Sequence, residues 1–125
     1  MAEVSGSNNI LTQVASGNMD GSQFCFANFT GADVWLTATS GSNALGVLQN
    51  KPRNNEHAAI VTHGNTKIRM ANSIGAGSRL MSGNSGFAVI ATSGQYVCGT
   101  ALTGATSGGI GEMFFNGYDA DVTLA

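Results

Sequence analysis

The chain has 125 residues, of which 42 % are hydrophobic and only 10 % are charged, and its formal net charge is −2. This length suits one domain, and the hydrophobic content combined with the low net charge excludes an intrinsically disordered chain. The 18 glycines and single proline favour short strands joined by glycine turns. The shortage of charge favours a surface that largely meets other protein, and the alternative is a free protein kept soluble by its scattered Ser and Thr.

The first 21 residues are expected to form an extended N-terminal arm. Beyond the first few positions, its large apolar residues are Ile10, Leu11, Val14 and Met19, set among Ser, Asn, Gly and Thr. The segment is either a frayed terminus or an arm that becomes ordered on a partner, with Ile10, Leu11 and Val14 as anchors. On either interpretation, removal of residues 1–20 should leave a folded domain. No signal peptide is expected, and no stretch approaches the ~18 apolar residues of a membrane-spanning helix.

After the arm, short apolar runs predict a series of strands. An aromatic run is followed by three further strands, and Gly46 in the third of these four marks a bulge or a close backbone approach. The segment His63-Gly64-Asn65 is expected to end the fourth. The predicted strands of this part are 23–29, 34–37, 44–48 and 57–62.

The next run, Lys67 to Met70, alternates cleanly. Ile68 and Met70 should point into the core, whereas Lys67 and Arg69 should point outward. Further strands are predicted at 79–81, 87–91, 96–102 and 112–115, with a possible edge strand at 122–124. No window of a dozen residues has helical periodicity, so the predicted fold class is all-β, a small sandwich or barrel.

An internal repeat organises this chain. The letters Ala-Thr-Ser-Gly at 38–41 recur at 91–94, and the same offset of 53 residues places Gly46 on Gly99 and Gly64 on Gly117. Residues 22–125 are therefore expected to form one β domain built from two similar half-units, at about 31–64 and 84–117. The functional surface should lie where the halves differ: the arm, the loop around Lys51 to Arg53, and the glycine loop at 103–109.

The chain has no pattern that predicts catalysis, a metal site or a cofactor. His57 and His63 lie six residues apart without a cluster of Cys or acidic residues beside them, which is a weak metal signal. A Gly-x-Ser-x-Gly nucleophile elbow is missing, and the glycine-rich segments do not open helices, as phosphate-binding loops would. Cys25 and Cys98 are interpreted as buried reduced thiols. We therefore do not expect an enzyme.

The basic residues are unevenly placed. All five lie in the middle third of the sequence, at Lys51, Arg53, Lys67, Arg69 and Arg79. Nucleic-acid binding would require a basic domain with aromatic platforms, whereas this chain is acidic overall and its aromatic residues lie elsewhere. A charge-asymmetric protein interface fits better, although an ordinary solvated face is the alternative. The candidate interface residues are Ile10, Leu11, Val14, Lys51, Arg53, Lys67 and Arg69.

Several segments resemble the small capsid decoration proteins of tailed phages, also called capsid cement proteins. They are Ile74-Gly-Ala-Gly-Ser-Arg-Leu-Met81, Gly86-Phe-Ala-Val-Ile-Ala91 and Val97-Cys-Gly-Thr-Ala-Leu102, with Leu45-Gly-Val-Leu-Gln-Asn50 as the first-unit version of the phrase. The resemblance covers about residues 30 to 117. Ser78 departs from the family pattern, because that position is often acidic in the family, and the loops after Gly46 and Gly99 are richer in Asn and Gly than usual.

The resemblance implies a non-enzymatic virion protein, made in the host cytoplasm, that binds the outer surface of an expanded icosahedral capsid and stabilises contacts between capsomers. The implied partners are the major capsid protein and further copies of the chain in a homotrimer, whose N-terminal arms add to a neighbour's sheet; neither nucleic acid nor a membrane is expected. Two alternatives stay open. One is a phage tail or baseplate β subunit, and the other is a carbohydrate-binding module with Trp35, Tyr96 or Tyr118 as stacking platforms.

Overall fold

The computed structural model describes residues 9–36, 44–83, 85–92 and 96–119. Within these ranges the chain forms nine strands and no helix, and each strand pairs with its neighbours in antiparallel fashion, so the predicted all-β class is confirmed. The strands are β1 (Asn9–Val14), β2 (Phe26–Thr30), β3 (Asp33–Leu36), β4 (Gly46–Leu48), β5 (His57–Arg69), β6 (Arg79–Ser82), β7 (Ala88–Ile90), β8 (Val97–Thr103) and β9 (Ile110–Asp119).

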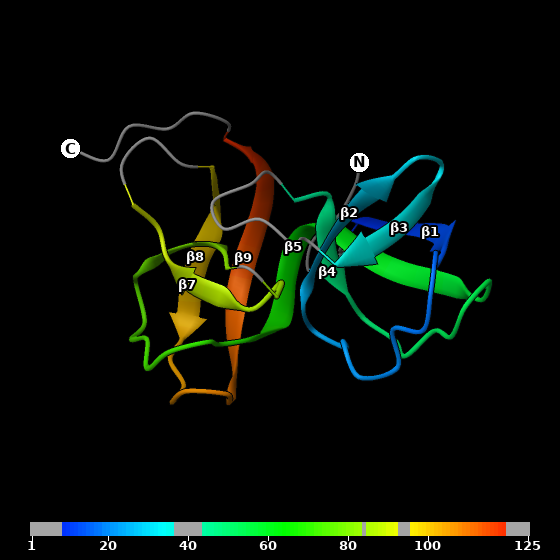
Figure 1. Cartoon of the computed structure of the whole chain (residues 1–125). Helices are drawn as coiled ribbons and strands as arrows, with labels where there is room; N and C mark the ends of the chain where they lie inside the picture. The colour runs from blue at the N-terminus through cyan, green and yellow to red at the C-terminus, as the bar shows by residue number, and fades with distance from the viewer. Residues whose placement is uncertain (1–8, 37–43, 84, 93–95, 120–125) are drawn as a thin grey trace.

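The long strand β5 divides the sheet into two sets. Its first half pairs with β4 and β1, and its second half pairs with β9; the full order is β3-β2-β4-β5-β9-β8-β6-β7, with β1 on β5. Isolated bridges connect Ala15, directly after β1, to Val34 of β3, and Met70, directly after β5, to Ala88 of β7. Each set of strands therefore curls until its two ends meet. Figure 1 shows the two resulting half-barrels side by side, with β5 passing between them.

The strand registers of the two halves repeat at the offset of 53 residues. The β4–β5 and β8–β9 ladders match in this way, and so do the β2–β4 and β6–β8 ladders. The matched pairs are Val47–Val61 with Thr100–Phe114, Leu48–Ile60 with Ala101–Met113, Phe26–Val47 with Arg79–Thr100, and Ala27–Gly46 with Leu80–Gly99. The two halves of the sheet therefore repeat one another in strand register, and the repeat begins earlier than the predicted bounds of about 31–64 and 84–117, because β2 and β6 belong to it.

The repeat also includes the segment predicted to be an arm. The Ala15 N–H donates to the Glu56 carbonyl oxygen (2.8 Å), and in the second half the Met70 N–H donates to the Gly109 carbonyl oxygen at the same distance. β1 is thus the counterpart of the second half of β5. In the structure, residues 9–14 of the arm expected at residues 1–21 form a strand of the chain's own sheet, because alternate backbone groups of this strand pair with β5. Residues 1–8 lie outside the described ranges.

The structure contradicts one predicted turn, and several other predicted segments lie outside the described residues. The turn expected at Gly64 is wrong: β5 continues through it, since Gly64 takes a φ of 124° and pairs with Phe115. The strand predicted at 122–124 and the first Ala-Thr-Ser-Gly copy at 38–41 lie outside the described residues, as do Ser93 and Gly94 of the second copy.

The two halves have separate cores built from equivalent positions. Large and small residues exchange places between them, so that Ala27 stands where the second half has Leu80, and Leu48 stands where it has Ala101. The buried residues of the first core are Ala15, Met19, Ala27, Val34, Leu48, Ala58 and Ile60. Their counterparts in the second half are Met70, Ile74, Leu80, Ala88, Ala101, Gly111 and Met113, and all but the glycine belong to the second core cluster. Each half thereby fills its own interior.

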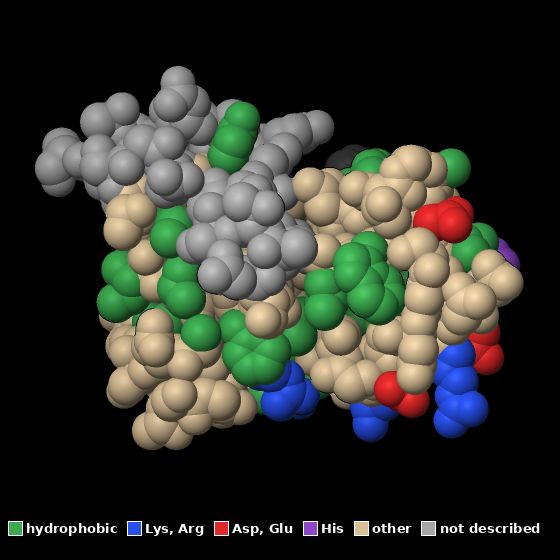
Figure 2. All heavy atoms as spheres, viewed as in Figure 1, with side chains coloured by type: hydrophobic (Ala, Val, Ile, Leu, Met, Phe, Trp, Pro, Cys, Tyr) green, Lys and Arg blue, Asp and Glu red, His purple; other side chains and the backbone are tan. Residues whose placement is uncertain are grey.

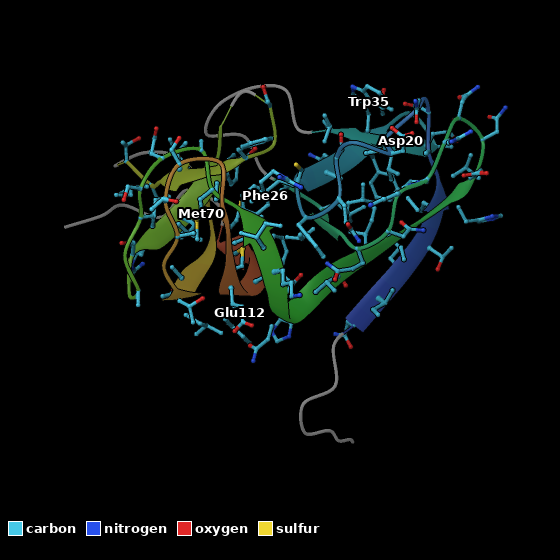
Figure 3. The ribbon with its side chains drawn as sticks, turned by 90° about the horizontal axis from the view of Figure 1, so that it is seen from below. Asp20, Phe26, Trp35, Met70 and Glu112 are labelled. Carbon is cyan, nitrogen blue, oxygen red and sulfur yellow. The ribbon has the colours of Figure 1, made fainter. Side chains whose placement is uncertain are left out.

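Phe26 joins the two half-barrels into one domain. This residue comes from β2 of the first half, is fully buried, and packs in the second core, where its ring centroid lies 6.1 Å from that of Phe115. Figure 3 shows Phe26 and Met70 inside the molecule, with Glu112 at its periphery. Because Val47 and Ala44 also belong to the second core, separating the halves would expose apolar surface from both.

Candidate functional site

Within the described ranges, the outer edge of β1 is open at Ile10 and Thr12. The backbone N–H and C=O of Ala15 both bond to residues 55 and 56, next to the start of β5. Since successive residues of a strand direct their polar groups to opposite edges, the backbone groups of Gln13 and Leu11 face β5, whereas those of Thr12 and Ile10 face outward. Beyond Thr12 this edge meets β3, because Ala15 forms a parallel bridge with Val34 and the Ser16 N–H donates to the Val34 carbonyl oxygen (2.9 Å). Among the described residues, β5 is the only strand that forms a ladder with β1.

This edge lacks two of the features that usually protect an edge strand, charge and proline. The sequence Asn-Ile-Leu-Thr-Gln-Val contains no charged residue and no proline. Ile10 is 59 % exposed, and Leu11 and Val14 are half-buried. The three predicted anchors therefore lie on one short strand whose outer edge is unpaired at Ile10 and Thr12 among the described residues, which is the arrangement needed to accept another extended segment.

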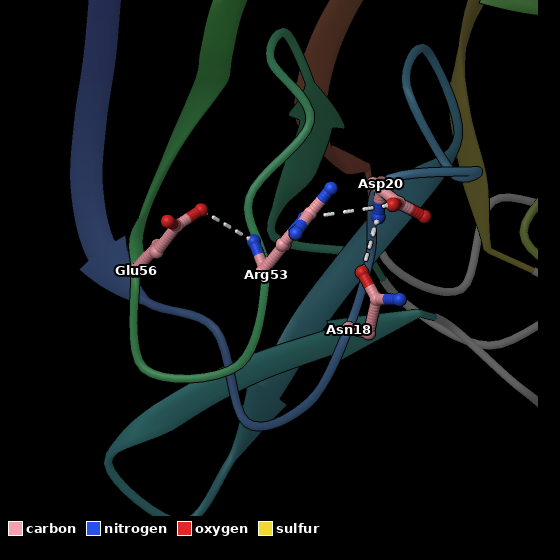
Figure 4. Close-up of polar contacts among 4 residues, drawn as sticks. All are labelled: Asn18, Asp20, Arg53 and Glu56. Carbon is pink, nitrogen blue, oxygen red and sulfur yellow. Dashed lines mark hydrogen bonds and ion pairs between the residues drawn. The ribbon is translucent and has the colours of Figure 1, made fainter.

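The four basic residues predicted to belong to an interface fall into two groups on different elements. Lys51 and Arg53 belong to the exposed loop between β4 and β5, and the Arg53 Nε lies 3.8 Å from an Asp20 carboxylate oxygen. The Arg53 backbone N–H donates to the Glu56 carboxylate (2.8 Å), and the Asp20 N–H donates to the Asn18 Oδ1 (3.1 Å), as Figure 4 shows. An ion pair this exposed contributes little stability, so Arg53 remains available to a partner.

Lys67 and Arg69 lie on the second half of β5, and each lies over an aromatic ring. The Lys67 Nζ lies 5.8 Å from the ring centroid of Phe24, and the Arg69 guanidinium carbon lies 5.9 Å from that of Phe87. The predicted alternation is confirmed, since Ile68 between them is fully buried. In the view of Figure 2, the visible Lys and Arg side chains lie along the lower edge, with hydrophobic surface above some of them.

The cleft beside Lys67 contains a strained residue that the sequence did not reveal. The cleft is lined by Phe24, Gln49, Asn65, Thr66, Lys67 and Glu112. Phe24 has a φ of 67°, a left-handed conformation that costs a residue with a side chain about 1–2 kcal/mol. The equivalent position is Gly77, with a φ of 88°, and each N–H donates to an equivalent carbonyl oxygen, that of Leu48 or Ala101. The sequence feature that could have identified this residue is the 53-residue offset, which aligns Phe24 with the turn glycine Gly77.

Replacing Phe24 by glycine should therefore cost less stability than replacing it by alanine. Both variants lose the aromatic ring, but only glycine adopts a positive φ without strain. We expect Phe24→Gly to be more stable than Phe24→Ala by about 1 kcal/mol. Urea denaturation of the two variants measures the difference, and equal stabilities would contradict the strain at Phe24.

The two thiols are confirmed to be free and buried. Burial raises the pKa of Cys25 to about 11, although the nearby Arg69 partly opposes this, and burial raises the pKa of Cys98 to about 12. Both therefore remain protonated at neutral pH and are poor nucleophiles. The described ranges contain no cluster of three or more His, Cys, Asp or Glu residues able to hold a metal, and no helix there is long and apolar enough to cross a membrane.

Of the three aromatic residues considered as glycan platforms, Trp35 is half-buried and packs against the first core. Tyr96 is 36 % exposed. The side chain of Tyr118 lies outside the described part of the structure.

Comparison with known proteins finds similarity of structure only. No family model matches the sequence, and no curated protein matches it. Among solved structures, the chain is similar to the N base of the head fiber gp8.5 of bacteriophage phi29, with a TM-score of 0.71 and 15 % sequence identity. The match covers 94 % of this chain and 100 % of that one. At this identity the likeness establishes a shared fold.

Proposed function

We propose that this chain is a structural protein of a bacteriophage virion that binds the outer surface of the capsid and stabilises contacts between capsomers. The observation that carries the proposal is the fold, which matches the base of a phage head fiber over nearly the whole chain. The sequence resemblance to capsid decoration proteins supports the same placement. The proposed partners are the major capsid protein and further copies of this chain in a homotrimer, and the proposed role involves no catalytic step, cofactor, nucleic acid or membrane.

The open edge of β1 supplies a means of attachment in this proposal. An extended segment of the capsid protein would pair with the outward backbone groups of Ile10 and Thr12. Because the protein would bind the assembled shell and not the dissociated subunits, attachment would stabilise the shell by mass action. A trimer would engage three such sites together and so raise the overall affinity.

Mixing the purified protein with bare expanded capsids tests the proposal. We expect co-sedimentation with the capsids and a higher capsid melting temperature. No binding and no change in melting would contradict it. Quantitative mass spectrometry of virions separates the tail alternative, because a decoration protein should be present in hundreds of copies, whereas a baseplate subunit should be present in few and a tail-tube subunit in a multiple set by tail length.

A proline scan of β1 tests the docking edge within the same assay. The Thr12 N–H faces outward, so Thr12→Pro removes a donor only from the open edge, a position where proline is tolerated. We expect at least tenfold weaker capsid attachment by Thr12→Pro with a melting temperature within a few degrees of the wild type. Gln13→Pro is the matched control: it removes a donor that faces β5, so its melting temperature should fall markedly. Unchanged attachment by Thr12→Pro would show that this edge does not dock the shell.

A further inference from the structure

The corner between the first strand and the hairpin is built differently in the two half-barrels. Trp35 and Val89 occupy equivalent positions. Trp35 pairs with Asn28 and Val89 pairs with Met81, and Asn28 and Met81 are themselves related by the 53-residue offset. In the first half the Trp35 indole lies against Gly17, so closely that a Cβ at Gly17 would come within 2.8 Å of the ring. An indole therefore covers this corner and requires a glycine beneath it.

In the second half the same corner is hollow. A pocket of about 310 Å³ is lined by Ala71, Gly83, Phe87, Val89, Ser107 and Gly108. Ala71 is the counterpart of Ser16, the neighbour of Gly17. The Ser16 N–H donates to the Val34 carbonyl oxygen, and the Ala71 N–H donates to the carbonyl oxygen of Ala88, the counterpart of Val34. The pocket thus occupies the corner that Trp35 covers in the first half, and Val89 is too small to cover it.

The walls of the pocket suit a flat apolar ring. Ala71, Phe87 and Val89 supply apolar surface, and the Ser107 hydroxyl already donates to the Ala71 carbonyl oxygen (2.8 Å). The Arg69 guanidinium lies over the Phe87 ring, where it could also contact a second ring by a cation–π interaction. Aromatic side chains seated in such pockets are the usual anchors of protein interfaces.

We propose that this pocket, between β7 and the 105–109 loop, accepts an aromatic side chain, tryptophan above all, from the protein to which the chain attaches. The chain's own Trp35 defines the ligand class, because it shows what the equivalent corner of the same fold holds. The identity of the partner as a capsid protein rests on the proposed function. The glycine loop at 103–109, where the halves were expected to differ functionally, forms part of the pocket wall.

The direct test is an NMR titration of ¹⁵N-labelled protein with N-acetyl-tryptophanamide. We expect saturable shifts at the amides of Ala71, Val89 and Gly108, and none at the first-half counterparts of these residues. The blocking variant is Asn72→Gly combined with Val89→Trp, which rebuilds the glycine and indole of the first half. It should fold and lose at least tenfold in affinity for the probe. Ile90→Trp is the control, because Ile90 points to the opposite face of β7 and is already 53 % exposed.

The outcomes separate this proposal from the proposed function. Loss of both probe binding and capsid attachment in the blocking variant, with both retained in Ile90→Trp, supports the pocket as a partner site. Saturable probe binding with no capsid attachment by the wild type would overturn the proposed function and leave the ligand class standing. Absence of shifts in the wild type, or full capsid attachment by a folded blocking variant, would overturn the pocket proposal. If the double variant does not fold, Val89→Phe serves as a smaller block under the same criteria.

Discussion

Removal of residues 1–20 is expected to abolish the cooperative folded state. The deletion removes β1, whose six residues pair with β5, and it removes Ala15 and Met19, which are fully buried in the first core. Truncation of a single buried methionine to alanine costs about 2–5 kcal/mol, and a whole domain is stabilised by about 5–15 kcal/mol. Loss of a complete strand together with two core side chains should therefore exceed what the first half-barrel can tolerate.

Thermal melting followed by far-ultraviolet circular dichroism checks this expectation. The control is deletion of residues 1–8 alone, which leaves β1, Ala15 and Met19 in place and should retain a cooperative transition. Cooperative melting of the longer deletion within a few degrees of the full chain would show that β1 is dispensable and would restore the interpretation of residues 1–20 as an arm. Capsid attachment of the two truncations cannot be compared until this result is known, because an unfolded protein also fails to bind.

Local sequence patterns predicted those parts of the fold in which burial of one strand face or a single glycine determines the structure. The alternation from Lys67 to Met70 identified an amphipathic strand because one face of it is buried. Gly46 was expected to mark a bulge or a close backbone approach, and the structure shows the close approach, to Val61. The strand β1 was missed because its apolar residues do not alternate, and because backbone pairing with β5, rather than side-chain burial, holds most of it. The continuity of β5 was missed because a glycine followed by asparagine usually ends a strand, whereas the positive φ of Gly64 only bends this one.

The candidate site was less accessible from sequence than the fold. Ile10, Leu11 and Val14 were singled out for their apolar character, yet the feature that makes their strand a candidate docking edge is the outward direction of the Ile10 and Thr12 backbone groups, which only the register reveals. The strain at Phe24 and the hollow corner beside Val89 become visible only through comparison with Gly77 and Trp35. The repeated letters indicated the offset, but equivalent hydrogen bonds, and not similar side chains, establish which residues correspond.

A cross-strand glycine contact that recurs in both halves leads to the second large expected effect. A Cβ added to Gly46 would fall on the Val61 carbonyl oxygen, and a Cβ added to Gly99 would fall on the Phe114 carbonyl oxygen, both well inside van der Waals contact. The obstacle in each case is backbone, so no rotamer change relieves it, and the strands would have to separate. Gly46→Ala and Gly99→Ala should therefore each cost about 3 kcal/mol or more, which corresponds to a fall in Tm of about 10 °C.

Calorimetric melting of the two variants measures these losses, and Gly75→Ala is the control because nothing lies within 4 Å of a Cβ added there. The control should melt within about 2 °C of the wild type, since an exposed substitution without a contact changes stability by about 0.5 kcal/mol or less. The two glycines occupy the same place in successive halves, so they should have similar effects. A large loss at Gly46 with a negligible one at Gly99 would mean that the ladders on β5 and β9 are not equivalent. The correspondence of Val89 with Trp35 rests on the same repeat, so that result would also remove the reason to expect an aromatic ring beside Val89.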